Sequence, residues 1–192
     1  LPIPGTSKIE HLEENCAAAK LKLTPDEWER IDLYQLHRID PKVPMEDSLG
    51  ALKQMQDAGK IRHVGLSEVS PEEIARARNT LPIASAQNHY NFAEREWENT
   101  LAYCEREGLG FLPWFPVGGG NGLTAQSVLE RVAKAHHASA YEVALAWLLE
   151  RSPVMLPIPG TSKIEHLEEN CAAAKLKLTP DEWERIDALA HR

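Results

Sequence analysis

Residues 61–78 read IRHVGLSEVSPEEIARAR and predict a β-strand that is followed at once by an α-helix. The first seven residues, 61–67, form a short β-rich run. Residues 70–73, Ser-Pro-Glu-Glu, then have the pattern of a helix capping box, with proline at the first helical position. This stretch therefore predicts one strand–helix unit and the boundary between its two elements.

The same alternation extends over most of the chain. Short β-rich runs occur at residues 33–37, 61–67, 83–88, 109–115 and 154–158, and a helical pattern follows each of them. After the first run, Met45, Leu49 and Leu52 recur at helical spacing, and Gly59 stands where a helix end usually requires a positive φ. Ser139 is predicted to start a later helix. Such alternation favours an α/β fold with parallel strands joined by helical crossovers.

The two ends of the chain carry the same 32 residues. Residues 1–32 read LPIPGTSKIEHLEENCAAAKLKLTPDEWERID, and residues 156–187 repeat this string without a change. Natural repeats drift, because most surface positions tolerate substitution at little cost. The identity therefore indicates a very recent duplication or deliberate construction, and we favour construction. With both copies included, we expect six strand–helix units, of which the first and last are identical.

Length, charge and cysteine content limit the class of protein. A chain of 192 residues fits a single domain over 1–192, and it is short for a closed barrel of eight strand–helix units, which needs about 250. The net charge of −8 argues against nucleic acid as a partner, because phosphate binding needs clustered positive charge. No apolar run approaches the roughly 20 residues that cross a bilayer. Three cysteines without a metal-binding spacing, and no leader pattern, predict reduced thiols in a cytoplasmic protein without a metal site.

Residues 158–170, IPGTSKIEHLEEN, have the features of a phosphate-binding turn. A predicted strand ends here, a glycine-bearing turn follows, and a helix begins with hydroxyl groups and a lysine. The first N–H groups of a helix are unpaired and lie at the positive end of its dipole, which suits a phosphate group. Taken alone, the same segment also fits a capped surface helix.

Four further segments, together with the phosphate-binding turn, resemble the aldo-keto reductases. They are residues 32–38 (DLYQLHR), 64–68 (VGLSE), 87–91 (QNHYN) and 114–118 (WFPVG). They occur in the order of that family, at the ends of successive predicted strands, and match its fourth to eighth strand–helix units over residues 33–192. The resemblance implies a TIM-barrel-derived α/β fold, here a partial or rearranged barrel of six strand–helix units. It also implies an oxidoreductase that binds NADP(H) and a small carbonyl compound.

The resemblance implies a role for one residue at each of four strand ends. His37 matches the active-site histidine that binds the carbonyl oxygen of the substrate. Ser67 and Gln87 match the residues that hold the nicotinamide carboxamide, although Glu68 replaces the asparagine often found beside that serine. Trp114 matches the aromatic residue that stacks against the nicotinamide ring.

Two further groups of residues match the phosphate and adenosine contacts of the family. The loop over the pyrophosphate corresponds to Pro116, Val117, Gly118, Gly119, Gly120 and Leu123. The group around the adenosine 2′-phosphate and adenine corresponds to Ser162, Lys163, His166, Glu169 and Asn170. His166 replaces the arginine most common there, so the sequence leaves the choice between NADP and NAD open.

The resemblance also implies a proton donor that the sequence does not supply. In the family this donor is a tyrosine activated by a lysine that is paired with an aspartate, and the three lie in the first three strand–helix units, which have no counterpart here. Strand alternation places Tyr34 on the face opposite His37, Tyr103 and Tyr141 lie in predicted helices, and Tyr90 has no lysine placed to activate it. We therefore expect weak NADP(H) binding with little or no carbonyl reduction.

Two other interpretations remain open from the sequence. The exact repeat favours a non-catalytic scaffold built by segment duplication, and a reductase with a repaired site is the third alternative. In all three cases an unpaired edge of a parallel sheet invites association, so we expect a homo-oligomer.

Overall fold

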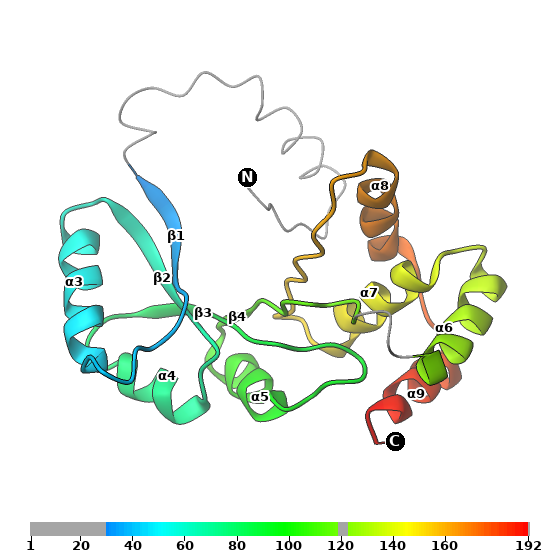
Figure 1. The fold of residues 1–192 in the computed structure, drawn as a ribbon, viewed down its shortest axis with the longest axis horizontal. Coiled ribbons are helices and arrows are strands. Elements are labelled where there is room, and N and C mark those ends of the chain that lie inside the picture. Colours follow the sequence, from blue (N-terminus) through cyan, green and yellow to red (C-terminus); the bar gives the residue numbers. More distant parts are fainter. Residues whose placement is uncertain (1–29, 119–122, 192) are drawn as a thin grey trace. The chain divides into compact units, whose positions relative to one another are not determined.

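The computed structural model describes residues 30–118 and 123–191, and within them it contains a four-stranded parallel sheet and a group of helices (Figure 1). In chain order the elements are β1 (Ile31–Leu36), α3 (Met45–Asp57), β2 (Ile61–Ser67), α4 (Pro71–Ala77), β3 (Ile83–Gln87), α5 (Glu98–Glu107), β4 (Gly110–Phe111), α6 (Leu123–His136), α7 (Ala140–Arg151), α8 (Ile164–Ala172), η2 (Ala173–Lys175), α9 (Pro180–Asp187) and η3 (Ala188–His191). The described residues divide into two compact units. We call residues 30–88 with 97–111 the sheet unit, and residues 89–96 with 112–191 the helical unit.

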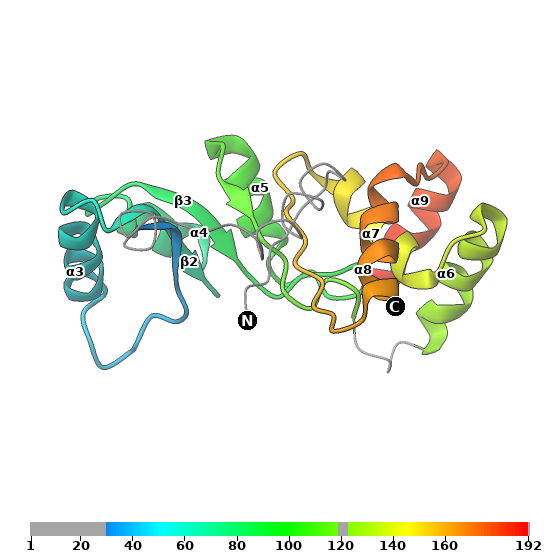
Figure 2. The same ribbon diagram turned by 90° about the horizontal axis from the view of Figure 1, so that it is seen from above.

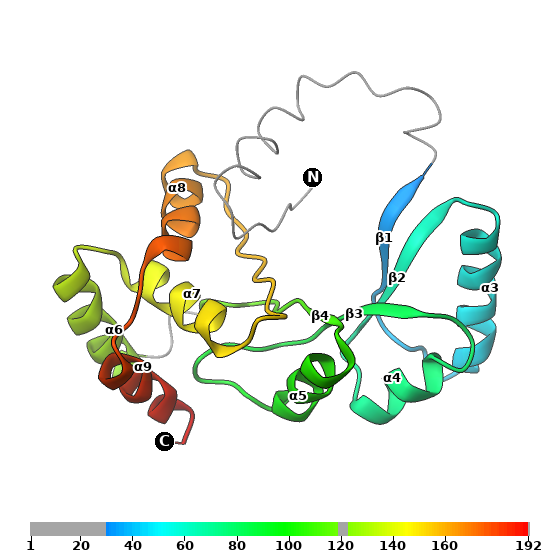
Figure 3. The same cartoon turned by 180° about the vertical axis from the view of Figure 1, so that it is seen from behind.

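The sheet unit consists of successive strand–helix pairs. Its strands lie in the order β1-β2-β3-β4, and every neighbouring pair is parallel. Helices α3, α4 and α5 connect them and lie on one face of the sheet (Figures 1 and 3). Leu49, Val64, Ile74 and Leu101 are fully buried between these helices and the strands, or nearly so. The unit therefore has the parallel, helix-connected architecture that the alternation predicted.

Local signals in the sheet unit act as the sequence predicted. Ser70 and Glu73 form both halves of the capping box, because the Ser70 side chain accepts from the Glu73 N–H and the Glu73 carboxylate accepts from the Ser70 N–H. Gly59 follows α3 with φ of +74°. These contacts depend only on neighbouring residues, so they could be predicted without the rest of the fold.

The predictions for two strands were wrong, because one segment forms no strand and the other forms a shorter strand than expected. Residues 154–158 form no strand among the described residues, although Met155 is in a β-bridge, and the strand predicted over 109–115 is reduced to Gly110–Phe111. Proline has no backbone N–H to donate to a ladder, and prolines at 153, 157 and 159 surround the first segment while those at 113 and 116 follow β4. The strand predicted at the start of the first repeat copy lies outside the described residues. Four of the predicted strands are therefore present in the described part of the chain.

The helical unit is organised around α7, which packs against α6 and α8 (Figure 2). Six consecutive residues of α7, 143–148, are buried, and Trp147 stacks on Trp183 of α9 at 6.0 Å between ring centroids. Ser139 starts α7, as the sequence predicted, and both Ser139 and Thr179 form complete capping boxes, at the starts of α7 and α9. The apolar surface of α7 thus forms the core of this unit.

Several other predictions can be compared with the described residues. None of the helices there is long and apolar enough to cross a membrane. Cys104 and Cys171 are free and buried, whereas Cys16 lies outside the described residues. The single domain over 1–192 stays a prediction.

Candidate functional site

The strand ends of the sheet unit bring three of the expected site residues to one edge. His37 directly follows β1, Ser67 is the last residue of β2 and Gln87 is the last residue of β3. Ser67 and Gln87 are partners in the β2–β3 register, and the Ser67 hydroxyl donates to the Gln87 carbonyl oxygen at 2.8 Å. Ser67 is buried, Gln87 is half-buried and His37 is exposed. The carboxyl edge of a parallel sheet is where such folds usually place their functional groups.

The loop after β2 is held rigidly beside Ser67. The buried Asn88 side chain donates to the Val69 carbonyl at 2.9 Å and accepts from the Val69 N–H at 3.2 Å. The Thr100 hydroxyl donates to the same carbonyl at 3.1 Å. Glu68, which replaces the expected asparagine, has a φ of +55° and forms an ion pair of 3.2 Å with Arg38. Both backbone groups of Val69 are thus paired, so the loop can hold Ser67 in one position.

In the helical unit, Trp114 is fixed by a stacked histidine. The rings of His89 and Trp114 lie 4.2 Å apart at an angle of 20°, and the two residues form a parallel β-bridge. The His89 Nε2 lies 2.8 Å from the Glu94 carboxylate. Stacking covers one face of the Trp114 indole, and this side chain is half-buried. The ring is therefore held in one orientation by its neighbour.

The turn after Trp114 has an unusual backbone. Phe115 has a φ of +58°, which costs a bulky residue about 1–3 kcal/mol and is common near functional sites. The Asn91 side chain donates to the Phe115 carbonyl at 3.2 Å and holds this conformation. Gly118 follows with a φ of +67°, where a side chain would be strained. The turn therefore contains two residues with a positive φ, Phe115 and Gly118.

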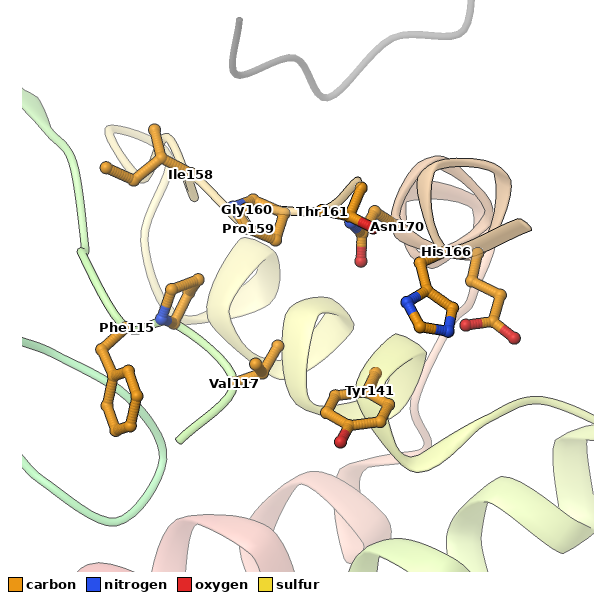
Figure 4. A pocket seen from close by; sticks show the side chains of 11 residues that line it. Phe115, Val117, Tyr141, Ile158, Pro159, Gly160, Thr161, His166 and Asn170 are labelled. Carbon is orange, nitrogen blue, oxygen red and sulfur yellow. The ribbon is translucent and has the colours of Figure 1, made fainter. Parts of the chain in front are cut away.

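A cavity of about 430 Å³ lies in the helical unit, between this turn and α8 (Figure 4). It is lined by Phe115, Pro116, Val117, Tyr141, Ile158, Pro159, Gly160, Thr161, His166, Glu169 and Asn170. The turn after β4, the residues before α8 and the first turns of α7 and α8 all contribute. A volume of this size is in the range that small-molecule sites occupy.

The cavity contains three of the five residues expected around the adenosine 2′-phosphate. His166, Glu169 and Asn170 line it from one side of α8. Ser162 and Lys163 are exposed immediately before that helix and are not among the lining residues. The N–H of Lys163, the N-cap residue of α8, donates to the Thr161 hydroxyl at 3.1 Å, so the entry to the helix is ordered.

The expected pyrophosphate loop is only partly described. Pro116 and Val117 line the cavity, whereas Gly118 follows them without being among the lining residues. Gly119 and Gly120 lie outside the described residues. Leu123 is the first residue of α6, and its backbone alone is described.

The sequence did not single out Tyr141 or Phe115, which also line the cavity. Both belong to segments whose distance from α8 is set by tertiary packing. For Phe115 a signal was present, because it lies between the expected ring-stacking tryptophan and the expected pyrophosphate loop. Among the residues of 30–118 and 123–191, no cluster of three or more histidine, cysteine or acidic side chains could hold a metal ion.

Comparison with known proteins identifies the class to which this chain belongs. The model of the aldo/keto reductase family matches residues 27–191, so the chain belongs to that family. An uncharacterized oxidoreductase of Schizosaccharomyces pombe is 47% identical over 158 residues, covering 82% of this chain and 52% of that protein. Pyridoxine 4-dehydrogenase of Escherichia coli is 42% identical over 146 residues, covering 76% and 51%. The chain thus spans about half the length of these curated relatives.

Solved structures support the same fold. A thermostable aldo-keto reductase in complex with the inhibitor epalrestat matches with a TM-score of 0.78 at 31% identity, covering 84% of this chain and 60% of that one. An aldo/keto reductase from Klebsiella pneumoniae in complex with NADP and acetate matches with a TM-score of 0.75 at 26% identity, covering 97% and 66%. The chain therefore has a TIM-barrel-like aldo-keto reductase fold whose described part includes a parallel sheet of four strands.

Proposed function

We propose that the chain binds NADP(H), with the adenosine 2′-phosphate end of the nucleotide in the cavity of the helical unit. The observation that carries this proposal is the cavity itself, because the turn after Trp114 and the first turns of α8 line it together. Family membership and the NADP complex of the Klebsiella pneumoniae relative support it.

The residues at the cavity suit an adenine nucleotide. His166 can donate a hydrogen bond to a phosphate, and Lys163 adds positive charge beside the start of α8, where the helix dipole also favours an anion. Glu169 and Asn170 can pair with the amino group and ring nitrogens of a base. When bound, the cofactor supplies hydride-transfer chemistry. The role proposed for Trp114 is to stack against its nicotinamide ring.

We further propose that the 192-residue chain reduces carbonyl compounds slowly or not at all. His37 supplies a hydrogen-bond donor for a carbonyl oxygen. No hydrogen bond or ion pair, however, links any of the described tyrosines to a lysine that could activate it. Tyr90 is fully buried, and burial raises its phenol pKa above the ordinary value, so it is a poor proton donor to a bound substrate. Tyr103 is bonded to Arg78 on the outer helices.

A titration with NADPH, followed by tryptophan fluorescence and by calorimetry, tests the binding proposal. We expect saturable binding that weakens with added salt, and we expect Lys163→Ala to reduce the affinity by about tenfold, which corresponds to one charge-assisted phosphate contact. Lys53→Ala is the matched control, because Lys53 is an exposed lysine of the sheet unit paired with Asp57. Absence of binding at millimolar NADPH would contradict the proposal.

A second candidate function is favoured by the exact repeat. A scaffold made by duplicating residues 156–187 needs no nucleotide. The duplicated segment should then affect folding or association and not nucleotide binding. In that case, removal of residues 1–32 changes solubility or oligomeric state while any NADPH affinity stays the same. Molar mass in solution, measured for both chains by light scattering, gives the comparison. The expected homo-oligomer and the cytoplasmic location stay predictions.

A further inference from the structure

Tyr141 is the one aromatic side chain that α7 contributes to the cavity (Figure 4). It is the second residue of α7, directly ahead of the buried stretch that forms the core of the unit. The residue is 57% exposed, which is unusual for a large aromatic residue next to a core. The capping box formed by Ser139 and Glu142 fixes the first turn of α7, so the position of Tyr141 is well defined.

The surroundings of Tyr141 suit the face and the edge of a purine. Val117 and Pro159 give the cavity apolar surface, while His166, Glu169 and Asn170 give it hydrogen-bonding groups on α8. Figure 4 shows the Tyr141 ring below the His166 imidazole, with the two side chains coming from different helices. A flat base needs an aromatic or apolar surface for its face and polar groups for its edge, and this cavity offers both.

The structure gives Tyr141 no competing role. No hydrogen bond, ion pair or ring contact involves it among the described residues, whereas Tyr103 and Tyr90, for example, are held by Arg78 and by stacking on Trp147. Tyr141 is not part of the buried core, since more than half of the residue is exposed. A side chain placed on a cavity wall without a structural partner is available to a ligand.

We infer that Tyr141 is a nucleotide-binding residue that stacks against the adenine base. This inference rests on the proposed function and deepens it, because it assigns the base, and not the 2′-phosphate, to the α7 side of the cavity. The contact is made by the face of the ring. It therefore recognises adenine in NADPH and NADH alike, and it does not depend on the phenol hydroxyl.

The test uses the full chain, with NADPH and with 2′,5′-ADP, which carries the adenosine end of the cofactor alone. Tyr141→Ala is expected to weaken both ligands by the same factor, about tenfold, which is in the lower part of the range for one base–aromatic stack. Tyr141→Phe keeps the ring and is expected to bind both as the unaltered chain does. Ile164→Ala is the matched control, because Ile164 is exposed at the start of α8 and does not line the cavity.

The outcomes separate this inference from the proposed function. If the unaltered chain fails to bind NADPH, both are overturned. If it binds NADPH and Tyr141→Ala binds equally well, only the role of Tyr141 is wrong. A loss of affinity in Tyr141→Phe equal to that in Tyr141→Ala also overturns the stacking assignment, since it would show that the hydroxyl makes the contact. Circular dichroism of each variant checks that the substitution leaves the fold unchanged, as expected for an exposed residue.

Discussion

Replacing Arg95 by alanine should destabilise the helical unit, because its side chain contacts three separate parts of that unit. Its guanidinium donates to the Asp187 carboxylate at 2.8 Å, to the Asp187 carbonyl at 2.7 Å and to the Phe92 carbonyl at 3.2 Å. It also lies 4.6 Å above the ring of Trp147. Arg95 therefore joins the segment that carries His89 to helix α9 and to the core of the unit.

The expected cost follows from the burial of the pair. The Arg95 and Asp187 side chains are only 13% and 29% exposed, so removing one partner leaves a poorly solvated charge. Breaking a buried ion pair costs about 3–5 kcal/mol, and partial exposure of Asp187 places this one at the lower end. The lost cation–π contact adds about 1 kcal/mol. The Nε of Arg95 is buried without a hydrogen-bond partner, so removing it regains about 1 kcal/mol, which offsets the loss of the cation–π contact. We expect a net loss of about 3 kcal/mol in the free energy of unfolding of this unit.

Urea denaturation followed by tryptophan fluorescence is a suitable assay, because Trp147 and Trp183 are stacked beside Arg95. Two compact units can give two transitions, so the data should be fitted without assuming a single one. Arg185→Ala is the matched control, since Arg185 is an exposed arginine of α9 paired with Asp181, and it should cost less than about 0.5 kcal/mol. If Arg95→Ala and Arg185→Ala cost the same, or if a double-mutant cycle with Asp187→Asn shows no coupling, the reasoning is refuted.

Three further predictions concern the fold and its pH dependence. Gly65→Ala should cost about 1–3 kcal/mol in urea denaturation, because a Cβ at this strand position would collide with the Gln35 carboxamide and force it to move. Burial raises the pKa of the Cys104 thiol to about 12, so Ellman's reagent should not modify it at pH 8 until the sheet unit unfolds; rapid modification of the native chain would contradict this. The Thr179 backbone N–H, which donates to Glu182, holds the pKa of that carboxyl below its ordinary value of 4.5. A lowered pKa stabilises the fold above pH 4.5 and the effect fades as pH falls, so the stability difference between the unaltered chain and Glu182→Gln should be larger at pH 7 than at pH 4 in denaturation curves.

The elements that the sequence predicted well are those defined by nearby residues. The capping boxes at Ser70, Ser139 and Thr179 and the positive φ at Gly59 were all predictable, because each depends on a few consecutive residues. The strand expected at 154–158 is reduced to a β-bridge at Met155, because prolines at 153, 157 and 159 have no N–H to donate to a ladder. We predicted a strand from the apolar composition of the segment and gave these prolines too little weight.

The site shows the same division between local and tertiary information. The spacing of His166, Glu169 and Asn170 places them on one side of α8, and the structure has them on one cavity wall. Tyr141 could not be associated with them, because its distance from α8 depends on how two helices pack. The positive φ of Phe115 has no sequence signature either, since only glycine and asparagine commonly indicate such a conformation.

The two copies of the repeat show that identical residues adopt different conformations in different surroundings. Ile31 and Asp32 open strand β1, whereas the identical residues Ile186 and Asp187 end helix α9. Ile31 is 47% exposed, while Ile186 is fully buried and Asp187 binds Arg95. Intrinsic propensities differ by only a few tenths of a kcal/mol per residue, whereas burying one isoleucine and forming that ion pair contribute about 2–5 kcal/mol. The same two residues therefore adopt the conformation that their neighbours in space stabilise. The segment that follows each copy, a strand-forming run after residue 32 and the short helix η3 after residue 187, helps to decide which neighbours they meet.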